Sequence, residues 1–561
     1  IPFHIDEVLP GDTHNIRTSV VCRLQTLDKP LMDNMYLDTY YFFVPMRLLW
    51  DHWKQFCGEN DAGPWITNKV EYSIPYLEYP SDTWFFPADS QNQFEGWKEG
   101  TLADYMGIPV NIPAGFFSSA KFTNSFCPSA LPFRAYAKCI NEFFRDQNLQ
   151  QPVVVHTDDL VRAGSNSNQW ITSLELGGKP FIAARLHNYF SSCLPAPQRS
   201  LDVSIFGGFN TGENLNQQAG IGPFAPVVTR GVTHTNSQVA KNTASLRGRL
   251  KGSSGSASGE MYLGADVGTG TGTETYAFPW SDQSTDGKYG FVPINLWASL
   301  NIPEATISNL RMAFQLQKYY EASARAGARY REYLKEFFGV DNGDARMQIP
   351  EYLGGHRIPL VIHQVANQSE SDGAKLGDLG AMSNTTDVHD DVHMSFSEHG
   401  YLLGLAVVRY ENTFSQGLER FWTRRKLLEF YNPVFANISD QPVYTRELAL
   451  YLMDENGNYY DADHVFGYNE AWADYRYKFS RVTSEMRPES ERSLASWHLA
   501  DDYSNTPFLS DDWIQMDKAN VDRVLNVTSE VANQIFCDFY VENKCVRPMP
   551  VHSIPGLADH H

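Results

Sequence analysis

The stretch that decides the fold lies near the start of the chain, where residues 36–44 read YLDTYYFFV. Aromatic and apolar residues occupy both alternating faces, which is typical of a β-strand that is covered on both sides. Before it, residues 15–26 alternate with a period of two, as a half-buried strand does. One face of that strand carries Ile16, Thr18, Val20, Cys22 and Leu24. The first fifty residues therefore predict two strands, separated by a turn at residues 28–30.

Two further strand patterns lie far along the chain. Residues 401–410 read YLLGLAVVRY, which predicts a buried strand. Near the other end, apolar and polar residues alternate again, with Ile535, Cys537, Phe539 and Val541 against Asp538, Tyr540 and Glu542. The first and last strands of one domain often pair, so we expect a single β-domain to span the whole chain.

Helical patterns lie between these strands. Pro132 stands where a helix can begin, and an apolar face follows at helical spacing. That face consists of Phe133, Tyr136, Ala137, Ile140, Phe143 and Phe144. A second helical pattern covers about residues 308–338, and Gly327 is expected to break or bend it. Helices between distant strands predict long, structured loops on a β-scaffold rather than alternating βαβ units.

The composition is that of a large globular protein. The chain has 561 residues, 42% of them hydrophobic, and a net charge of −21. No apolar run reaches the roughly 18 to 20 residues of a membrane helix. The acidic balance argues against a protein that coats nucleic acid by bulk charge alone. The seven cysteines include no CxxC pair, so we expect buried free thiols in a reducing cytoplasm.

Residues 204–292 differ in kind from the rest. Fifteen of the 24 residues from 252 to 275 are Gly, Ser or Thr, and the wider stretch carries six acidic and six basic residues. The remaining chain therefore carries the whole net charge. A neutral, glycine-rich segment between two well-patterned regions predicts an insertion at a loop tip, where insertions are tolerated.

Two patterns suggest ligands. Residues 388–399 read VHDDVHMSFSEH, in which His389, Asp391 and His393 share one face of an extended chain. They are interpreted as a polar strand face, with a metal site as the alternative. The segment ERFWTRRK contains a basic and aromatic cluster suited to charge contacts and base stacking with single-stranded nucleic acid. This cluster consists of Arg420, Phe421, Trp422, Arg424, Arg425 and Lys426, and its alternative role is a solvated strand end or a subunit contact.

No catalytic signature such as G-x-S-x-G or H-E-x-x-H occurs in the sequence. The 12 Trp and 29 Tyr residues are compatible with a sugar cleft lined by paired carboxylates. A secreted β-sandwich carbohydrate-active enzyme or lectin is therefore one candidate function. Glycan turnover by a monomer would favour this function, and a particle-sized mass would favour an assembly of many copies instead.

Several long blocks of this sequence resemble one family. The opening, IPFHIDEVLPGDTHNIRTSVVCRLQTLDKPLMDNMYLDTYYFFVPMRLLWDHW, is similar to the start of major capsid proteins of the Microviridae, above all of the gokushoviruses. The resemblance continues in LPFRAYAKCINEFFRDQNL, MAFQLQKYYEASARAGARYREYLKEFFGV, FGYNEAWADYRYKFSRVTSEMRP and RPMPVHSIPGLADHH. These blocks cover most of the chain outside about residues 204–292.

The resemblance implies a viral jelly roll, an eight-stranded antiparallel β-sandwich with large inserted loops that carry helices. Residues 1–203 and 293–561 would form it. It also implies a T=1 icosahedral shell around a circular single-stranded DNA genome, assembled in the bacterial host cytoplasm, with no enzymatic activity or cofactor. Residues 204–292 would form a protrusion at the threefold axis for host attachment. Its expected anchors are Leu246, Leu250, Tyr262, Tyr276, Phe278 and Trp280.

The partners that the resemblance implies are other copies of the chain, the DNA, an internal scaffolding protein, a minor pilot protein and a host surface receptor. A small, very basic packaged protein would bridge the genome and the acidic shell. The chain begins with Ile1, and an N-terminal segment before it, if basic, would add to this bridge. The basic and aromatic cluster at residues 420–426 would contact the DNA.

Overall fold

The computed structural model describes residues 1–59, 71–78, 97, 99–110, 127–163, 174–199, 229–233, 246–249, 260–263, 289–293, 307–327, 329–341, 343–368, 376–436, 438–450 and 463–549. The chain divides into two compact units. The first unit is made of Ile1–Leu201 and Gln317–His561, and the second of Asp202–Leu316. Among the described residues no helix combines the length and the apolar character that a bilayer span requires.

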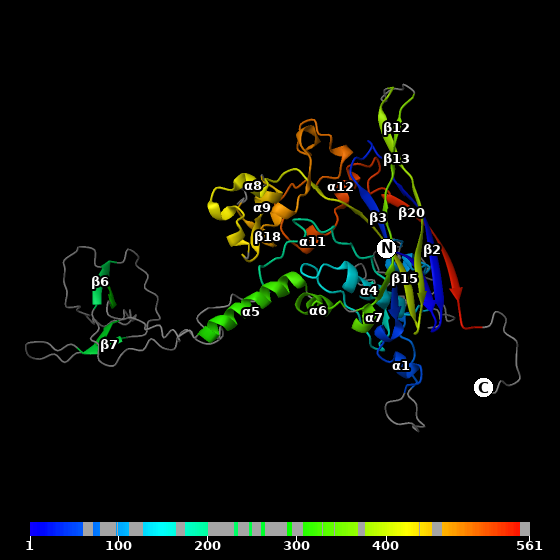
Figure 1. Ribbon diagram of the computed structural model, residues 1–561, viewed down its shortest axis with the longest axis horizontal. Coiled ribbons are helices and arrows are strands. Elements are labelled where there is room, and N and C mark those ends of the chain that lie inside the picture. The colour runs from blue at the N-terminus through cyan, green and yellow to red at the C-terminus, as the bar shows by residue number, and fades with distance from the viewer. Residues whose placement is uncertain are drawn as a thin grey trace, which may run out of the picture. The chain divides into compact units, whose positions relative to one another are not determined.

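Two antiparallel sheets form the frame of the first unit (Figure 1). The five strands of the first sheet are β1 (Pro2–Val8), β15 (Gly400–Tyr410), β3 (Met35–Pro45), β10 (Glu351–Gly354) and β11 (Arg357–Pro359), where β10 and β11 both pair with β3. The second sheet has the order β14 (Thr385–Ser395), β2 (Thr13–Leu24) and β20 (Ile535–Val546). The mainly β class is thereby confirmed, with eight sandwich strands that, in the described part of the chain, do not close into a barrel.

The predicted strands are all present, and the ends of the chain do pair. The strand expected at 36–44 is β3, that at 15–26 is β2, and those at 401–410 and 535–541 are β15 and β20. β2 and β20 run antiparallel over their whole lengths, from Thr13 opposite Val546 to Leu24 opposite Ile535. A domain that spans the sequence is therefore closed by strands from opposite ends.

The core between the sheets follows from the period of two along each strand. Val20, Cys22 and Leu24 of β2 pack with Met35 and Leu37 of β3 in one buried cluster. A second cluster joins Ile16 of β2, Tyr41 and Phe43 of β3, Val392 of β14 and Leu402 of β15. The hydroxyl oxygens of Thr18 and Tyr41 lie 2.7 Å apart inside this core, so these two buried polar groups hydrogen-bond to each other.

The outer face of the first sheet is covered by a helix, which explains the aromatic residues on both faces of β3. Helix α4 (Leu131–Cys139) begins with Pro132 in its first turn and continues into a π-helical segment, η4 (Ile140–Phe144). Its apolar face packs on Phe42 and Val44 of β3 and on Leu403 and Leu405 of β15. The helix predicted from Pro132 is therefore confirmed.

The second predicted helix is two helices. α5 (Ile307–Ala326) ends before Gly327, whose φ of +105° is a conformation that side-chain-bearing residues rarely adopt. α6 (Tyr330–Phe338) follows, and its first turn is closed by the Glu332 carboxylate, which accepts the backbone N–H of Arg329 at 3.1 Å. Gly327 therefore breaks the pattern, as expected.

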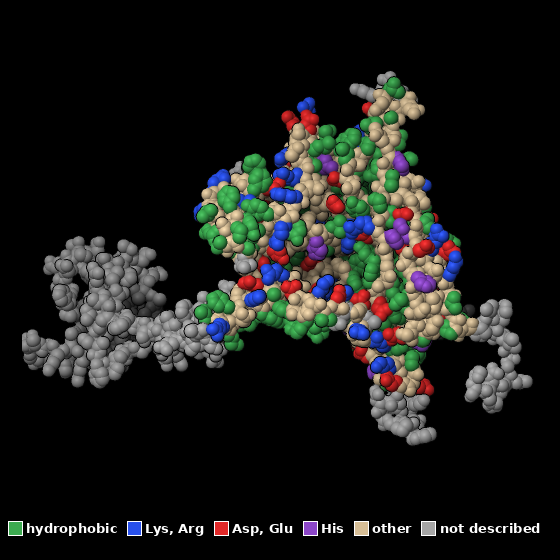
Figure 2. All heavy atoms as spheres, viewed as in Figure 1, with side chains coloured by type: hydrophobic (Ala, Val, Ile, Leu, Met, Phe, Trp, Pro, Cys, Tyr) green, Lys and Arg blue, Asp and Glu red, His purple; other side chains and the backbone are tan. Residues whose placement is uncertain are grey.

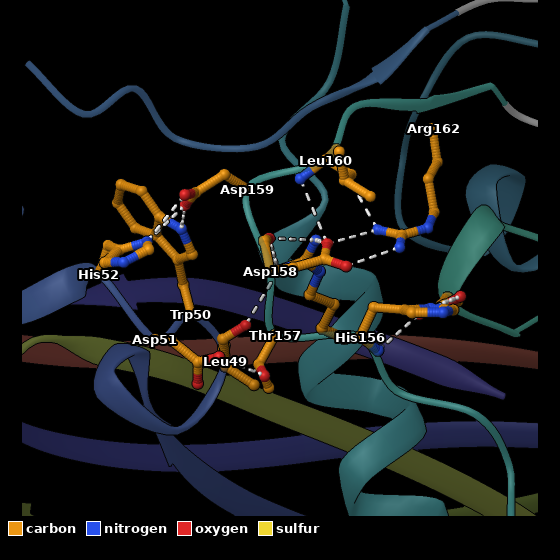
Figure 3. A network of polar contacts seen from close by, with 12 residues as sticks. Leu49, Trp50, Asp51, His52, His156, Thr157, Asp158, Asp159, Leu160 and Arg162 are labelled. Atoms are coloured by element: carbon orange, nitrogen blue, oxygen red, sulfur yellow. Dashed lines mark hydrogen bonds and ion pairs between the residues drawn. The ribbon is translucent and has the colours of Figure 1, made fainter.

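A polar network fixes the loop of residues 156–162 against the start of α4 (Figure 3). The guanidinium of Arg134, buried in α4, donates to the carbonyl oxygens of Leu49 and Asp158 at 3.1 Å each. Arg162 donates two hydrogen bonds to the Asp158 carboxylate, at 2.7 and 2.8 Å. Asp159 accepts the indole N–H of Trp50 at 2.5 Å. The loop is thus held by charge-assisted hydrogen bonds rather than by regular structure.

This network predicts an acid-sensitive loop. The hydrogen bonds from Arg162 lower the pKa of Asp158 from its ordinary 3.8 to about 2. Because the pKa of the folded state is the lower one, the stabilisation is complete above about pH 4 and is lost as the pH falls towards 2. Asp158→Asn should remove this component of the pH dependence and cost about 1 kcal/mol or less at pH 7, since the carboxylate is 43% exposed. Urea unfolding of both forms between pH 2 and 7 measures it, and parallel curves would contradict it.

A separate lobe of the first unit has its own buried cluster. We call residues 411–436, 438–450 and 463–514 the lobe. Phe414, Val443, Leu448, Phe466 and Trp513 share a core there with residues 189–193. Its elements are α8 (Arg420–Thr423), η7 (Leu427–Glu429), η8 (Pro433–Phe435), β17 (Gln441–Tyr444), α9 (Thr445–Leu448), β18 (Val465–Asn469), α10 (Ala473–Arg476), η9 (Ser484–Met486), η10 (Ala495–Trp497), α11 (Asp511–Ile514), and the parallel pair β16 (Thr413–Phe414) and β19 (Ser480–Arg481).

Shorter elements complete the first unit. They are η1 (Met46–Leu48), α1 (Trp53–Phe56), β4 (Leu77–Glu78), α3 (Leu102–Tyr105), β5 (Arg162–Ala163), η6 (Leu174–Leu176), α7 (Asp344–Met347), β12 (Ile362–Ala366), β13 (Leu379–Ser383) and α12 (Lys518–Asp522). β12 and β13 form a hairpin-like pair beside the sandwich.

The second unit contains the insertion predicted at residues 204–292 and extends beyond it to Leu316. It has two antiparallel pairs, β6 (Thr229–Thr233) with β9 (Tyr289–Pro293) and β7 (Leu246–Arg249) with β8 (Glu260–Leu263). Of the expected anchors, Leu246 lies in β7 and Tyr262 in β8. Leu250, Tyr276, Phe278 and Trp280 lie outside the described residues.

Candidate assembly surface

Large apolar side chains project into solvent on one side of the lobe. Leu427, Leu428 and Val434 are 76%, 63% and 83% exposed. Figure 2 shows hydrophobic side chains gathered on the lobe, where Figure 1 places α8. We call this surface the apolar patch, and its members are Phe421, Trp422, Leu427, Leu428, Phe430, Tyr431, Val434 and Tyr475. A contiguous surface of this kind marks an interaction site more often than a solvated face.

Two capped 3-10 turns, η7 and η8, carry the most exposed residues of the patch. Asn432 caps η8 by accepting the N–H of Val434 at 3.0 Å, and Pro433 occupies the first helical position. Glu429 accepts the N–H of Lys426 at 2.9 Å and so closes η7. These two side chains satisfy backbone N–H groups of the short turns that carry the exposed Leu427, Leu428 and Val434.

Trp472 anchors the patch to the lobe. Its indole N–H donates to the carbonyl oxygen of Phe435 at 3.0 Å, and its ring meets that of Tyr431 edge to face at 5.7 Å. Trp472 itself is only 6% exposed. The exposed side chains therefore stand on a rigid base, which lowers the entropy that a binding partner must overcome.

Two cations of the predicted DNA-contact cluster are engaged inside the lobe. The guanidinium of Arg420 lies 2.8 Å from the carboxylate of Glu447, which also accepts the hydroxyl of Tyr189 at 2.9 Å. Burial alone would lower the pKa of Arg420, but the charge on Glu447 raises it. Arg424 forms an ion pair with Asp474, and the Arg424 side chain is 6% exposed. Both arginines therefore stabilise the lobe.

The other members of that cluster do face solvent. Phe421 and Trp422 are 42% and 58% exposed, and Arg425 and Lys426 are exposed as well. The structure thus brings the six predicted residues together, but only four of them are exposed to solvent and free to contact DNA. Sequence reasoning missed the aliphatic neighbours, although the run LLEFYNPVF at 427–435 was a signal because it is apolar without a helical or strand period.

Of the histidine and aspartate residues of 388–399, all but His399 lie on a strand. β14 carries His389 and Asp391, and the Nδ1 atom of His356 lies 2.9 Å from the Asp391 carboxylate. The rings of His356 and His389 stack at 3.7 Å. A register shift between Asp390 and Val392 interrupts the strand, so His393 does not lie on the same face as His389 and Asp391, and the single polar face expected for the three residues is not continuous.

Within the described ranges, the donor atoms that come close enough to share a metal ion belong to Asp12, His14 and Cys545. The Asp12 carboxylate already has partners, since it accepts the N–H of Leu9 at 2.9 Å and lies 3.0 Å from the Arg547 guanidinium. We interpret this group as a buried ion pair that secures the start of β2.

A rigid β-sandwich with long loops and an uncovered apolar patch defines a structural protein that associates through its surface. Comparisons with known proteins agree. The model of the capsid protein (F protein) family matches residues 1–557, and the chain belongs to this family.

The relatives are capsid proteins of viruses and phages. The chain is 36% identical over 565 residues to capsid protein VP1 of Spiroplasma virus 4, covering 99% of this chain and 92% of the relative. It is 34% identical to VP1 of Chlamydia phage 1 and 32% identical to VP1 of Bdellovibrio phage phiMH2K, covering 99% of this chain and 92% and 91% of those proteins. The resemblance to the Microviridae is confirmed, and the protein is a structural component of a virion.

Proposed function

We propose that this capsid protein closes into a T=1 icosahedral shell around circular single-stranded DNA, and that the apolar patch is buried between neighbouring copies. The patch carries the proposal. Its eight side chains are 42% to 83% exposed, and large aromatic and aliphatic side chains expose on the order of 150–250 Å² each when free. The patch therefore offers roughly 1,000 Å², against about 800 Å² per partner in a standard interface.

The chemistry of the patch favours a protein partner over DNA. Leu427, Leu428 and Val434, its most exposed members, have no ring to stack on a base and no charge for a phosphate. Aliphatic side chains gain free energy when another apolar surface removes them from water. Closed symmetry repeats each contact, so a shell is stable even when single contacts are weak.

Contact with DNA is proposed at one edge of the patch, where the subunit contact would leave the rings of Phe421 and Trp422 partly uncovered. Phe421 and Trp422 offer rings for stacking, and Arg425 and Lys426 offer charge. Since the whole chain carries a charge of −21, we also propose a small basic packaged protein between shell and genome. Internal scaffolding and pilot proteins complete the proposed partners, and the role of this chain is structural, with no catalytic step and no cofactor.

The assembly proposal is tested by expression with a scaffolding partner in a bacterial host. Sedimentation should show a megadalton particle, and image reconstruction should show icosahedral symmetry with the patch at a subunit contact. A chain that stays monomeric with all its phage partners present would contradict the shell. A shell with the patch exposed would contradict only the assignment of the patch.

The insertion at residues 204–292 is proposed to protrude at the threefold axis and to bind the host receptor. Its segment 252–275 is rich in Gly, Ser and Thr, and loops of this kind carry recognition while the scaffold stays fixed. Three copies of the anchors Leu246, Leu250, Tyr262, Tyr276, Phe278 and Trp280 would form the base of the protrusion.

Deletion of residues 252–275 is therefore expected to leave particle yield within about twofold of the parent, because the sandwich strands lie elsewhere. Adsorption to host cells should fall at least tenfold. Particle yield and adsorption are measured separately. A loss of particles would show that the segment is needed for assembly, and unchanged adsorption would place the receptor contact elsewhere on the shell.

A further inference from the structure

Two cysteines stand directly opposite each other where the ends of the chain pair. Cys22 of β2 and Cys537 of β20 are register partners in the antiparallel ladder. Their Sγ atoms lie 3.1 Å apart, and both are free thiols. Directly opposed residues on neighbouring antiparallel strands have Cα separations within the range that disulfides span. The strands thus place both sulfur atoms within reach of a bond without a change of fold.

The pair is accessible from one side. Cys22 is fully buried, but Cys537 is exposed, because β20 is an edge strand that pairs with β2 alone in the described sheet. Cys537 also lines a cavity of about 750 Å³ between the sheets, beside Phe3, Val408 and Phe539. A small molecule can therefore reach the sulfur of Cys537 but not that of Cys22.

The two thiols differ in reactivity as well. The hydrogen bond between the two sulfur atoms lowers the pKa of Cys537. The same contact, together with burial, raises the pKa of Cys22 well above its usual range. The exposed sulfur is therefore the one that ionises first, and the thiolate is the attacking species in disulfide exchange.

We propose that Cys22 and Cys537 form an intramolecular disulfide by exchange with a small-molecule disulfide. The Cys537 thiolate attacks one sulfur of the small disulfide, whose S–S bond breaks, and the first small thiolate leaves. Cys22 then attacks the Cys537 sulfur of the mixed disulfide and gives up its proton, and the second small molecule leaves as a thiol. The two protein thiols are oxidised, and one small disulfide is reduced to two thiols.

Four of the other cysteines are not placed to compete. Cys139 and Cys193 are buried in two separate clusters, away from the sandwich interior. The Cys545 sulfur faces His14 at 3.4 Å, and Cys57 is exposed beyond the end of α1. The chemistry is therefore directed to the pair on β2 and β20.

The bond would join segments 515 residues apart in the sequence. A crosslink over so long a loop restricts the unfolded chain strongly, and it also holds the edge strand β20 in the sheet. Because the bond lies within one subunit, it does not depend on the proposed shell contacts.

The test uses intact particles, or soluble subunits if no particles form, treated with oxidised glutathione or left reduced. The protein is then denatured and alkylated, digested without reduction and mapped by mass spectrometry. We expect a linked peptide pair that contains Cys22 and Cys537, and two fewer alkylated cysteines in the oxidised sample. The apparent Tm should rise by about 2–5 °C on oxidation and return on reduction.

Cys537→Ser should abolish both the linked peptide and the Tm shift, whereas Cys57→Ser, a matched change at another exposed cysteine, should preserve both. The mapping of the unsubstituted chain stands even if the serine variant does not fold. Full alkylation of Cys22 and Cys537 after oxidation would overturn the proposal. So would a glutathione adduct on Cys537 that never resolves, or a link between Cys537 residues of two chains.

Discussion

A chain that carries Leu427→Asp together with Val434→Asp is expected to fold but to lose shell assembly by at least about 100-fold. Both side chains are largely in water in the subunit, at 76% and 83% exposure, so the new charges cost little there. In an interface, each carboxylate would be buried without a partner, which costs about 3–5 kcal/mol. Particle yield by sedimentation and the Tm of the soluble subunit measure the two effects separately.

Two comparisons show whether the effect belongs to the patch. Val531→Asp introduces the same charge at a valine that is 80% exposed outside the lobe, and should leave assembly intact. Arg425→Ala with Lys426→Ala should preserve shells but reduce their retention of DNA. Normal yields from the Leu427 and Val434 variant would show that the patch is not a subunit contact.

The second large effect is expected at a charge that is almost fully buried in the lobe. Asp501 accepts a hydrogen bond from Arg185 at 2.5 Å, and their side chains are 2% and 5% exposed. Asn520 and Tyr503 donate to the same carboxylate at 2.8 and 2.7 Å. Asp501→Ala should destabilise the chain by about 3–5 kcal/mol, because it leaves the Arg185 charge buried and unpaired.

A variant that lacks both charges distinguishes the cost of an unpaired buried charge from the cost of lost packing. Arg185→Met with Asp501→Ala should be more stable than Asp501→Ala alone, since no buried charge remains. Glu485→Ala, which breaks an ion pair whose arginine, Arg492, is 84% exposed, should cost well under about 1 kcal/mol. Chemical denaturation measures all three variants. Equal losses for Asp501→Ala and Glu485→Ala would contradict the argument.

The long sandwich strands β2, β3, β15 and β20 were predictable because their signal is local, whereas β1, β10 and β11 were not predicted. The alternation along β2, the two apolar faces of β3 and the break at Gly327 are all properties of a few neighbouring residues. The pairing of β2 with β20 followed from the tendency of first and last strands to pair, although the chain's first strand is β1, which pairs with β15.

The lobe was not predictable in the same way. α8, α9 and α10 have four residues each, too few to show a helical period. The partners of Arg420 and Arg424 lie 27 and 50 residues away, so the sequence did not show which cations were engaged. The strands β6 to β9 fall in a segment whose composition suggested only loops.

The pairing of β2 with β20 also means that the second sheet is completed only late in protein synthesis. Position 537 is translated 515 codons after position 22. At about 5–20 residues per second, roughly 30–100 s pass before the ribosome delivers the second strand. Throughout that interval one edge of β2 has no partner, and a nascent chain in this state is exposed to chaperones and to aggregation. A chain whose synthesis ends before β20 lacks one strand of the second sheet. Such a truncated chain cannot complete the sandwich.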